Sequence, residues 1–145
     1  MDRRTVRRRL DASLAGVEVP AVPHQGWLRA IRDAMGLSGR LLGERLGVSQ
    51  QRVSKIEQAE VDGSITLRSL REAAAAMDCE VVYAVVPRSS LEEMVHTRAR
   101  KKARELVDPV DVTMALEGQQ VDGDRTRELI EELADELIDN PRLWS

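Results

Sequence analysis

The chain has 145 residues, a length that allows one good core, or one domain plus an appendage. It has no Phe, two Trp and one Tyr, so its core must be aliphatic and rich in Ala, which favours helices. One cysteine excludes an intramolecular disulfide, and two distant histidines without ligand-spaced companions suggest no metal cluster. No apolar run reaches the length of a membrane span and no signal peptide opens the chain, so we expect a cytoplasmic protein.

The net charge of −3 conceals an uneven distribution along the chain. Residues 1–104 hold 19 Lys+Arg against 13 Asp+Glu, whereas residues 105–145 hold 3 against 12. A basic body suits a phosphate backbone, which would repel an acidic tail. We therefore expect the first part to meet nucleic acid and the tail to face elsewhere or to bind another protein.

A helix is predicted over residues 2–15, where Val6, Leu10 and Leu14 form an apolar stripe. The arginines around this stripe are Arg3, Arg4, Arg7, Arg8 and Arg9. They are either additional phosphate contacts, such as an arm in a minor groove, or a solvated helix face, and the sequence does not separate the two. Gly and Pro residues make residues 16–24 an extended connector.

Residues 25–78 have the pattern of a small helical bundle. Trp27 opens an amphipathic helix, and we interpret it as a core anchor rather than a residue that stacks on nucleic acid. Two short helices follow between Leu37 and Glu60 and are hinged at Gly47, where Gly adopts a left-handed backbone at little cost. The apolar residues expected on the inner faces are Met35, Leu37, Leu41, Leu42, Leu46, Val53 and Ile56. A polar loop over residues 59–65 then leads to a helix that begins after Thr66.

The hinged pair of helices resembles the DNA-binding domain of the XRE (Cro/cI-like) phage-repressor class. The resemblance covers about twenty residues and is carried by Gly47-Val48-Ser49, Val53-Ser54 and Ile56-Glu57, which match the turn and the recognition helix of that class. It implies a repressor-like bundle that binds double-stranded DNA at an operator. An ordinary two-helix corner is the alternative interpretation of the same residues.

The second helix of the pair would read the DNA. Its first residues reach base edges in this class, and a glutamine can bond adenine bidentately. Ser38 and Ser49 are expected as N-caps, at helix ends whose amides favour phosphate. The class commonly has Gln at the position of Gly39, and Arg40 is the expected substitute. The predicted DNA-binding residues are Ser38, Arg40, Ser49, Gln50, Gln51, Arg52, Ser54 and Lys55.

The stretch from Cys79 to Val86 is short and β-branched, and Pro87 ends it, so it predicts one β-strand. A lone strand must pair, and the chain offers only a weak partner in the Val17–Val22 region. Pairing with the same strand of a second subunit is therefore our hypothesis for a homodimer, which would place two recognition helices about one DNA turn apart. We interpret Cys79 and Tyr83 as packing residues.

Two further helix starts follow the predicted strand. Ser90-Leu91-Glu92-Glu93 is a capping box, and it opens a helix whose far half is crowded with cations. Those cations are Arg98, Arg100, Lys101, Lys102 and Arg104, either touching DNA or solvated near the helix C-terminus. Asp108-Pro109 opens a short helix that stops at Gly118, and a loop through Gly123 precedes a last helix over residues 124–139. Leu143 and Trp144 are then free to fold back onto a surface or a partner.

The short acidic helix carries a second motif. Thr113-Met114-Ala115-Leu116-Glu117-Gly118 resembles the inhibitory helix of Fic-domain regulators, [ST]-x-x-x-E-[GN]. The resemblance implies that Glu117 enters the ATP site of a Fic toxin, pairs with an arginine and prevents transfer of AMP. Thr113 lies one turn before Glu117 on the same face, and Gly118 lets the chain leave directly behind the acid.

The overall layout resembles a family called mobile mystery protein A, which is associated with Fic-type partners. The residues that carry this resemblance are Gly26-Trp27, Ile31-Arg32-Asp33-Ala34, Thr66-Leu67, Val85-Val86-Pro87 and Thr113-Met114-Ala115-Leu116-Glu117. It implies an antitoxin that represses its own promoter and inhibits a Fic-domain AMP-transferase. The alternative is a stand-alone dimeric repressor whose acidic tail binds another protein.

We therefore predict a mainly α protein: a repressor-like helix-turn-helix bundle with one short β-strand and a C-terminal helical extension. The expected segments are a basic helix and connector (1–24), the DNA-binding domain (25–78), a dimerisation and linker part (79–107) and an acidic antitoxin segment (108–145). No nucleophile with a neighbouring base, no phosphate loop and no metal set is apparent, so we expect neither an enzyme nor a cofactor.

Overall fold

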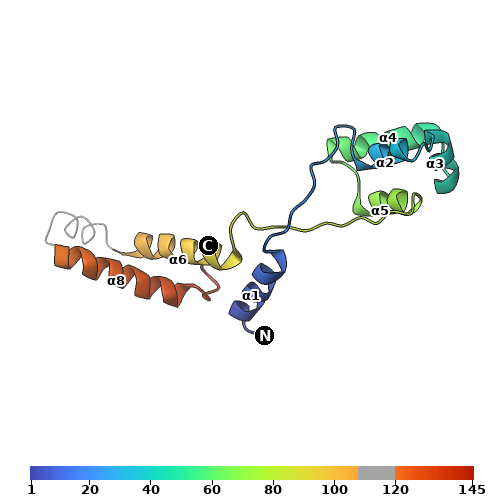
Figure 1. Cartoon of the computed structure of the whole chain (residues 1–145). Helices are drawn as coiled ribbons and strands as arrows, with labels where there is room; N and C mark the ends of the chain where they lie inside the picture. The colour runs from blue at the N-terminus through green and yellow to red at the C-terminus, as the bar shows by residue number, and fades with distance from the viewer. Residues whose placement is uncertain (108–119) are drawn as a thin grey trace. The chain divides into compact units, whose positions relative to one another are not determined.

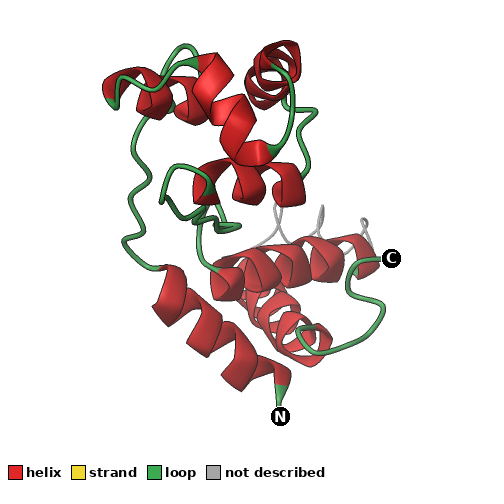
Figure 2. Cartoon of the chain, turned by 90° about the vertical axis from the view of Figure 1, so that its right-hand side faces the viewer, coloured by secondary structure: helices red, strands yellow, loops and turns green. Residues whose placement is uncertain are grey.

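Every regular element in residues 1–107 and 120–145, which the computed structural model describes, is an α-helix (Figures 1 and 2). The helices are α1 (Arg3–Leu14), α2 (Trp27–Ala34), α3 (Gly39–Leu46), α4 (Gln50–Asp62), α5 (Leu67–Ala75), α6 (Leu91–Leu106) and α8 (Gln120–Leu137). They form two compact units, one made of Glu18–Val85 and the other of Met1–Val17 with Val86–Ser145. The prediction of a mainly helical protein is confirmed.

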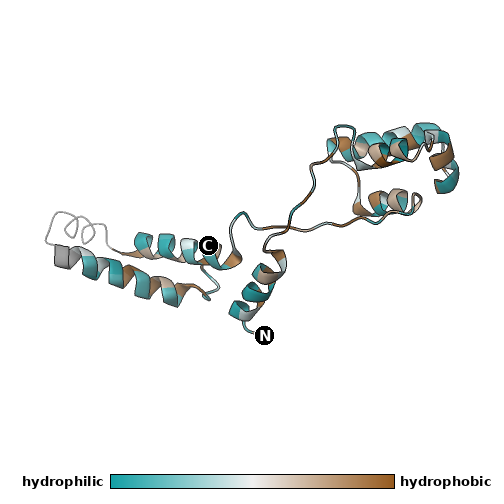
Figure 3. Ribbon diagram, viewed as in Figure 1, coloured by the Kyte–Doolittle hydropathy of each residue, from teal (hydrophilic) through white to brown (hydrophobic). Residues whose placement is uncertain are grey.

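The unit Glu18–Val85 contains α2 to α5 around one small aliphatic core. Each of these helices carries both hydrophilic and hydrophobic residues (Figure 3). Apolar side chains from the four helices pack into one cluster. The buried members of this core are Leu28, Leu42, Val53, Ala73 and Met77. Partly buried side chains such as Ile31, Leu46 and Ile56 pack around them. The core therefore lies directly behind the helix pair that the sequence singles out.

The second unit is a hairpin of α6 and α8 with α1 packed on α6. Ala99 and Ala103 of α6 meet Ala134 of α8 and the C-terminal Leu143, and all four are buried. Alanine at a helix contact allows a close approach of the two axes. Leu143 folds back and is 1% exposed, while Trp144 beside it stays 62% exposed.

Polar contacts hold α1 to this hairpin, because none of its own residues is buried. Arg7 Nε donates to Glu92 Oε1 at 2.6 Å, and its Nη1 donates to Asp139 Oδ1 at 3.2 Å. Asp11 accepts from the backbone amides of Leu91 (2.7 Å) and Glu92 (3.1 Å), and so caps the start of α6 from another helix. Arg7, for which a phosphate contact and a solvated helix face were both left open, is therefore part of an internal ion pair.

The helix starts predicted at Ser38, Ser49, Thr66 and Ser90 are confirmed, and two predicted loops are too long. Ser38, Ser49, Thr66 and Ser90 each accept a hydrogen bond from the backbone amide three residues on. The loop expected from residue 59 begins later, because α4 continues to Asp62 and ends at Gly63 with φ +82°. The loop expected through Gly123 is wrong at its end, since α8 already begins at Gln120.

The predicted β-strand over Cys79–Val86 is not present. That stretch carries neither helix nor strand within the described chain, and the Val17–Val22 region offers it no ladder. A β-branched composition favours an extended backbone, but a strand exists only where a second strand accepts and donates its hydrogen bonds. The prediction of a strand is therefore wrong, because the described part of the chain supplies no partner strand.

Some apolar residues expected inside lie at the surface. Leu41 is 39% exposed and Met35 50% exposed, and Trp27, predicted as a core anchor, is 37% exposed at the rim of a groove. Helical spacing identifies which face of a helix is apolar. How much of that face is buried depends on the neighbouring helices.

None of the described helices combines the length and the hydropathy that a membrane span requires. The short helix predicted after Asp108, with Thr113, Glu117 and Gly118, lies outside the described residues.

Candidate nucleic-acid interface

The turn between α3 and α4 is tight, and two glycines make it so. Gly47 ends α3 with φ +70°, a left-handed conformation that glycine adopts without strain. Gly43, one turn earlier, is buried against the chain leaving the turn, and a Cβ there would lie 2.6 Å from the carbonyl oxygen of Val48. The missing side chain of Gly43 therefore allows the backbone of the turn to cross close to α3.

Ser38 and Ser49 open the two helices of the pair. The Ser38 Oγ accepts from the amide of Leu41 and the Ser49 Oγ accepts from the amide of Arg52, both at 3.1 Å. A hydroxyl that accepts one bond still has its own proton to donate. Both serines can therefore cap a helix and bond a phosphate at the same time, next to the positive end of the helix dipole.

The start of α4 presents a row of exposed polar side chains. The exposed residues are Gln50, Gln51, Arg52, Ser54 and Lys55, while Val53 between them is 1% exposed and holds the helix to the core. Within the described residues, no hydrogen bond or ion pair engages the side chains of Gln50, Gln51, Arg52 or Lys55. Two amides and two cations at a helix N-terminus are therefore available to an outside ligand.

Arg40 is placed differently from this row. Its Nη1 lies 2.7 Å from Glu44 Oε1, one turn along α3, and both side chains are exposed. Gly39 before it lies beside the recognition helix, since a Cβ there would be 3.6 Å from Gln50 Cγ. To bind a phosphate, Arg40 must give up its ion pair with Glu44, and losing an exposed ion pair costs little free energy.

A buried ion pair attaches α4 to α2, and sequence reasoning missed it. Arg32 Nε and Nη2 donate to the two carboxylate oxygens of Glu57 at 2.9 and 3.0 Å, and its Nη1 donates to the carbonyl of Leu37 at 3.1 Å. The hydrogen bond that Arg32 donates to Glu57 raises the pKa of the Arg32 guanidinium. Glu57 is buried one turn after Val53, and an acid on the apolar face of a helix was the available signal.

A second acid of α4, Glu60, caps the start of α2. Its carboxylate accepts from the amides of Trp27 (2.7 Å) and Leu28 (2.8 Å), at a helix whose N-cap is Gly26 and lacks a side chain to do this. A Cβ on Gly26 would lie 3.0 Å from the Glu60 carboxyl carbon. Helix α4 is thus held at two points along its length by α2.

A small hollow lies beside the exposed row, between α4 and the start of α5. Its volume is about 170 Å³, and its lining includes Arg52, Lys55, Ser64, Thr66 and Ser69. Two cations and the hydroxyls of Thr66 and Ser69 can donate to a phosphate oxygen there, whereas the Ser64 hydroxyl already donates to Asp62 Oδ1. Ser64 and Ser69 were not among the predicted contacts, because only folding brings them beside α4.

Several cations of α6 act within their own unit. Arg98 Nε donates to the carbonyl of Leu143 at 2.9 Å, and Lys102 Nζ donates to the carbonyl of Arg142. Arg100 pairs with Glu131 of α8 at 3.1 Å. These three side chains fasten the C-terminal turn and α8 to α6, so the cluster is not a free basic patch.

Other chemistry-bearing residues show no site among the residues that the structure describes. No group of three or more His, Cys, Asp or Glu is arranged to hold a metal ion within that part of the chain. The thiol of Cys79 donates to the carbonyl of Met77 at 3.3 Å, as expected of a packing residue.

Comparison with known proteins identifies the helix pair and its surroundings. Residues 28–83 match the family model described as Helix-turn-helix. No match was found among curated proteins, and none among solved structures. The match spans α2 to α5 and the chain that follows α5, which includes the whole core behind the exposed row. Residues 28–83 are therefore an XRE-type helix-turn-helix domain, the DNA-binding domain of transcription regulators.

Proposed function

We propose that this protein is a dimeric autorepressor that reads its operator with α4. The observation that supports the proposal is the unengaged row Gln50, Gln51, Arg52 and Lys55 at the N-terminus of a recognition helix. Gln50 and Gln51 read base edges, while Ser38, Arg40, Ser49, Ser54 and the nearby cations position the phosphate backbone. The helix-turn-helix match supports the DNA-binding part of this proposal.

Replacing Gln51 tests the assignment of base reading. We expect Gln51→Ala to weaken operator binding at least tenfold while non-specific binding changes little, because a bidentate glutamine contributes about 1–3 kcal/mol of discrimination. Gln58→Ala is the matched control, since Gln58 is exposed on nearly the same face of α4 but two turns further on. Fluorescence anisotropy at fixed salt measures both DNAs, and an equal loss on both would make Gln51 a positioning residue only.

We propose further that the acidic segment makes the protein an antitoxin. The sequence Thr113–Gly118 supports this, together with the reversal of charge after residue 104. Glu117 enters the ATP site of a partner Fic-domain AMP-transferase, where its carboxylate pairs with a guanidinium and occupies the place of an anionic phosphate. Thr113 precedes Glu117 by four residues and Gly118 follows it directly, as the motif [ST]-x-x-x-E-[GN] requires.

Glu117→Gly tests this second role. We expect the variant to lose inhibition of AMP transfer by a Fic-domain partner that co-purifies with the chain, while the two proteins still associate. Glu128→Ala removes the same charge from an exposed position of α8 and should inhibit fully. Undiminished inhibition by Glu117→Gly would remove the assignment.

A point substitution separates the antitoxin from the alternative, a stand-alone repressor with a protein-binding tail. Deleting residues 108–145 would not separate the two functions, because α8 and Leu143 supply the residues that bury Ala99 and Ala103 of α6. Such a truncation exposes the inner face of α6 and changes the fold as well as the function.

A further inference from the structure

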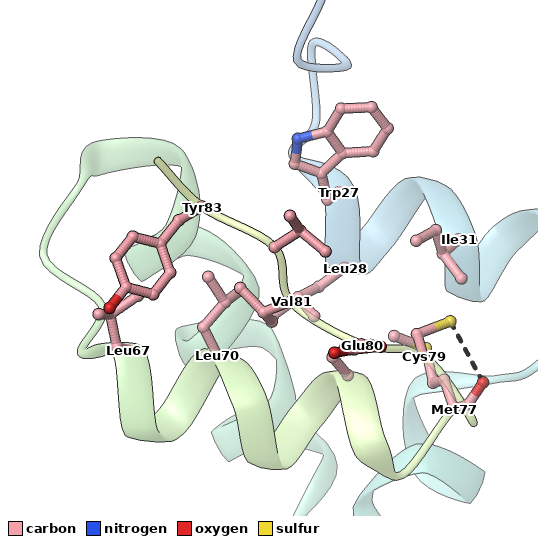
Figure 4. A pocket seen from close by; sticks show the side chains of 12 residues that line it. Trp27, Leu28, Ile31, Leu67, Leu70, Met77, Cys79, Glu80, Val81 and Tyr83 are labelled. Carbon is pink, nitrogen blue, oxygen red and sulfur yellow. Dashed lines mark hydrogen bonds between the residues drawn. The ribbon is translucent and has the colours of Figure 1, made fainter. Parts of the chain in front are cut away.

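An apolar groove lies on the unit Glu18–Val85, between α2, α5 and the chain that follows α5 (Figure 4). Its volume is about 290 Å³, and Trp27, Leu28 and Ile31 line one side while Leu67 and Leu70 line the other. In Figure 4 the side chain of Val81 lies between these two sides, and the ring of Tyr83 lies beside Leu67. One wall of the groove is therefore the segment that begins at Cys79.

The same segment carries large apolar side chains into solvent. Val82 and Val85 are each 86% exposed and Tyr83 is 60% exposed, with its ring 5.5 Å from the Arg71 guanidinium. Single exposed valines are ordinary, but three large apolar side chains exposed within four consecutive residues, beside an apolar groove, are not. Patches of this kind mark surfaces that another chain covers.

The backbone of this segment is also unpaired. In the described part of the chain, no backbone hydrogen bond is made by residues 80–86, in contrast to Cys79, whose amide donates to Ala74. A stretch rich in β-branched residues with free amides and carbonyls is a template for pairing with a further strand. The occupant must therefore supply an extended backbone as well as apolar side chains.

We propose that residues 80–88 pair antiparallel with the same residues of a second copy, with Ala84 on the two-fold axis. The sequence is complementary in this register at its charged and apolar pairs, and Val81 faces Pro87, which has no N–H and so must lie at a pair without ladder hydrogen bonds. Glu80 of one copy faces Arg88 of the other, Val82 faces Val86, and Tyr83 faces Val85. Opposite charges and aromatic or β-branched pairs are favourable across strands, whereas a parallel pairing in register would set Glu80 against Glu80.

The two-fold symmetry of this dimer rests on the proposed function. One helix-turn-helix domain matches in each chain, and a two-fold dimer brings two of them to the operator. It names the surface through which the two copies meet. The second copy covers the valines that stand exposed in one chain and continues the wall of the groove.

Sedimentation velocity of the full chain tests the interface without DNA or any toxin. We expect the wild type to dimerise at micromolar concentration and Val82→Asp to raise the dimer dissociation constant at least tenfold, equivalent to 1.4 kcal/mol. Val19→Asp is the matched control, since Val19 is also exposed and lies outside the segment, and it should dimerise as the wild type does. A monomeric wild type, or a Val82→Asp variant that dimerises normally, would overturn the proposal; unchanged helical circular dichroism shows that the variants fold.

A charge exchange tests the register. Glu80→Arg and Arg88→Glu should each weaken the dimer several-fold, because each sets like charges opposite one another twice per dimer. An equimolar mixture of the two variants should recover wild-type affinity, since every pair in the mixed dimer again joins opposite charges. A mixture no tighter than either variant would exclude the antiparallel register. If Val82→Asp abolishes the dimer but the variant still binds a DNA half-site, the proposal that α4 reads DNA is unaffected. The two proposals are therefore tested separately.

Discussion

Gly43 has no side chain, and the fold of the helix-turn-helix domain requires that absence. It is buried in the middle of α3, where alanine is normally preferred over glycine. The chain that leaves the turn at Val48 passes too close for any side chain at this position. The separation of the two helices, and with it the exposure of the row at the start of α4, depends on this absent Cβ.

We expect Gly43→Ala to lower the free energy of unfolding by about 1–3 kcal/mol, the usual cost of overpacking a well-packed site. The contact is with backbone, which cannot move aside as a flexible side chain would. Gly39→Ala is the control in the same helix, because its nearest neighbour is at 3.6 Å and alanine there gains helix propensity. Urea denaturation measures both, and equal stability of the two variants would contradict the close approach.

Among the elements, α1 is unusual because charge rather than apolar burial holds it in place. Val6 and Leu10 of its apolar stripe are 37% and 46% exposed, while Arg7 lies between Glu92 and Asp139. The hydrogen bond from Arg7 holds the pKa of the Glu92 carboxyl below its ordinary value. A carboxylate held in this way stabilises the folded state only while it is ionised.

The attachment of α1 should therefore weaken in acid. Because the folded pKa of Glu92 is lowered, its contribution is present above the ordinary value of 4.5 and is lost as the pH falls through the lower, folded pKa. We expect Arg7→Gln to lower the free energy of unfolding by about 1–2 kcal/mol at pH 7 and by much less in strong acid, where the wild type has lost the same interaction.

Arg8→Gln is the control, because it removes the same charge from an exposed position and should keep the acid dependence of the wild type. Urea unfolding at several pH values, followed by far-ultraviolet circular dichroism, distinguishes the two, and parallel pH profiles for wild type and Arg7→Gln would contradict the ion pair.

At the scale of the molecule, the described residues form two cores with no buried residue in common. Leu42 belongs to the core of Glu18–Val85, and Leu143 belongs to that of the α6–α8 hairpin; each is 1% exposed. In our proposal the DNA-reading residues all belong to the first core's unit. Damage to one core should then leave the structure around the other intact.

Hydrogen exchange with mass spectrometry tests this separation. We expect Leu42→Ala to cost about 2–5 kcal/mol and to accelerate exchange in α2 to α5 only. Leu143→Ala should accelerate exchange in α6 and α8 and leave α2 to α5 unchanged. Each variant serves as the control for the other, and acceleration in both units by either substitution would show that they unfold together.

Local features of the sequence were sufficient to predict the α3–α4 helix pair and the exposed row at the start of α4. Ser38 and Ser49 cap the amides three residues on, and Gly47 turns the chain in the left-handed region, because these interactions span only a few residues. The exposed row at the start of α4 follows from the same helical spacing that buries Val53. The role of each residue of that row toward DNA stays a prediction.

Only the tertiary structure decided which distant residues meet. Arg32 finds Glu57, Glu60 caps α2, and Arg7 joins α6 and α8, over separations in sequence that no spacing rule encodes. The same reason explains the strand that is not present, since Cys79–Val86 has the composition of a strand but no partner within the described chain. A helix satisfies its backbone within one segment, whereas an ion pair, a cap from another helix and a strand each require a partner that folding or a second chain must supply.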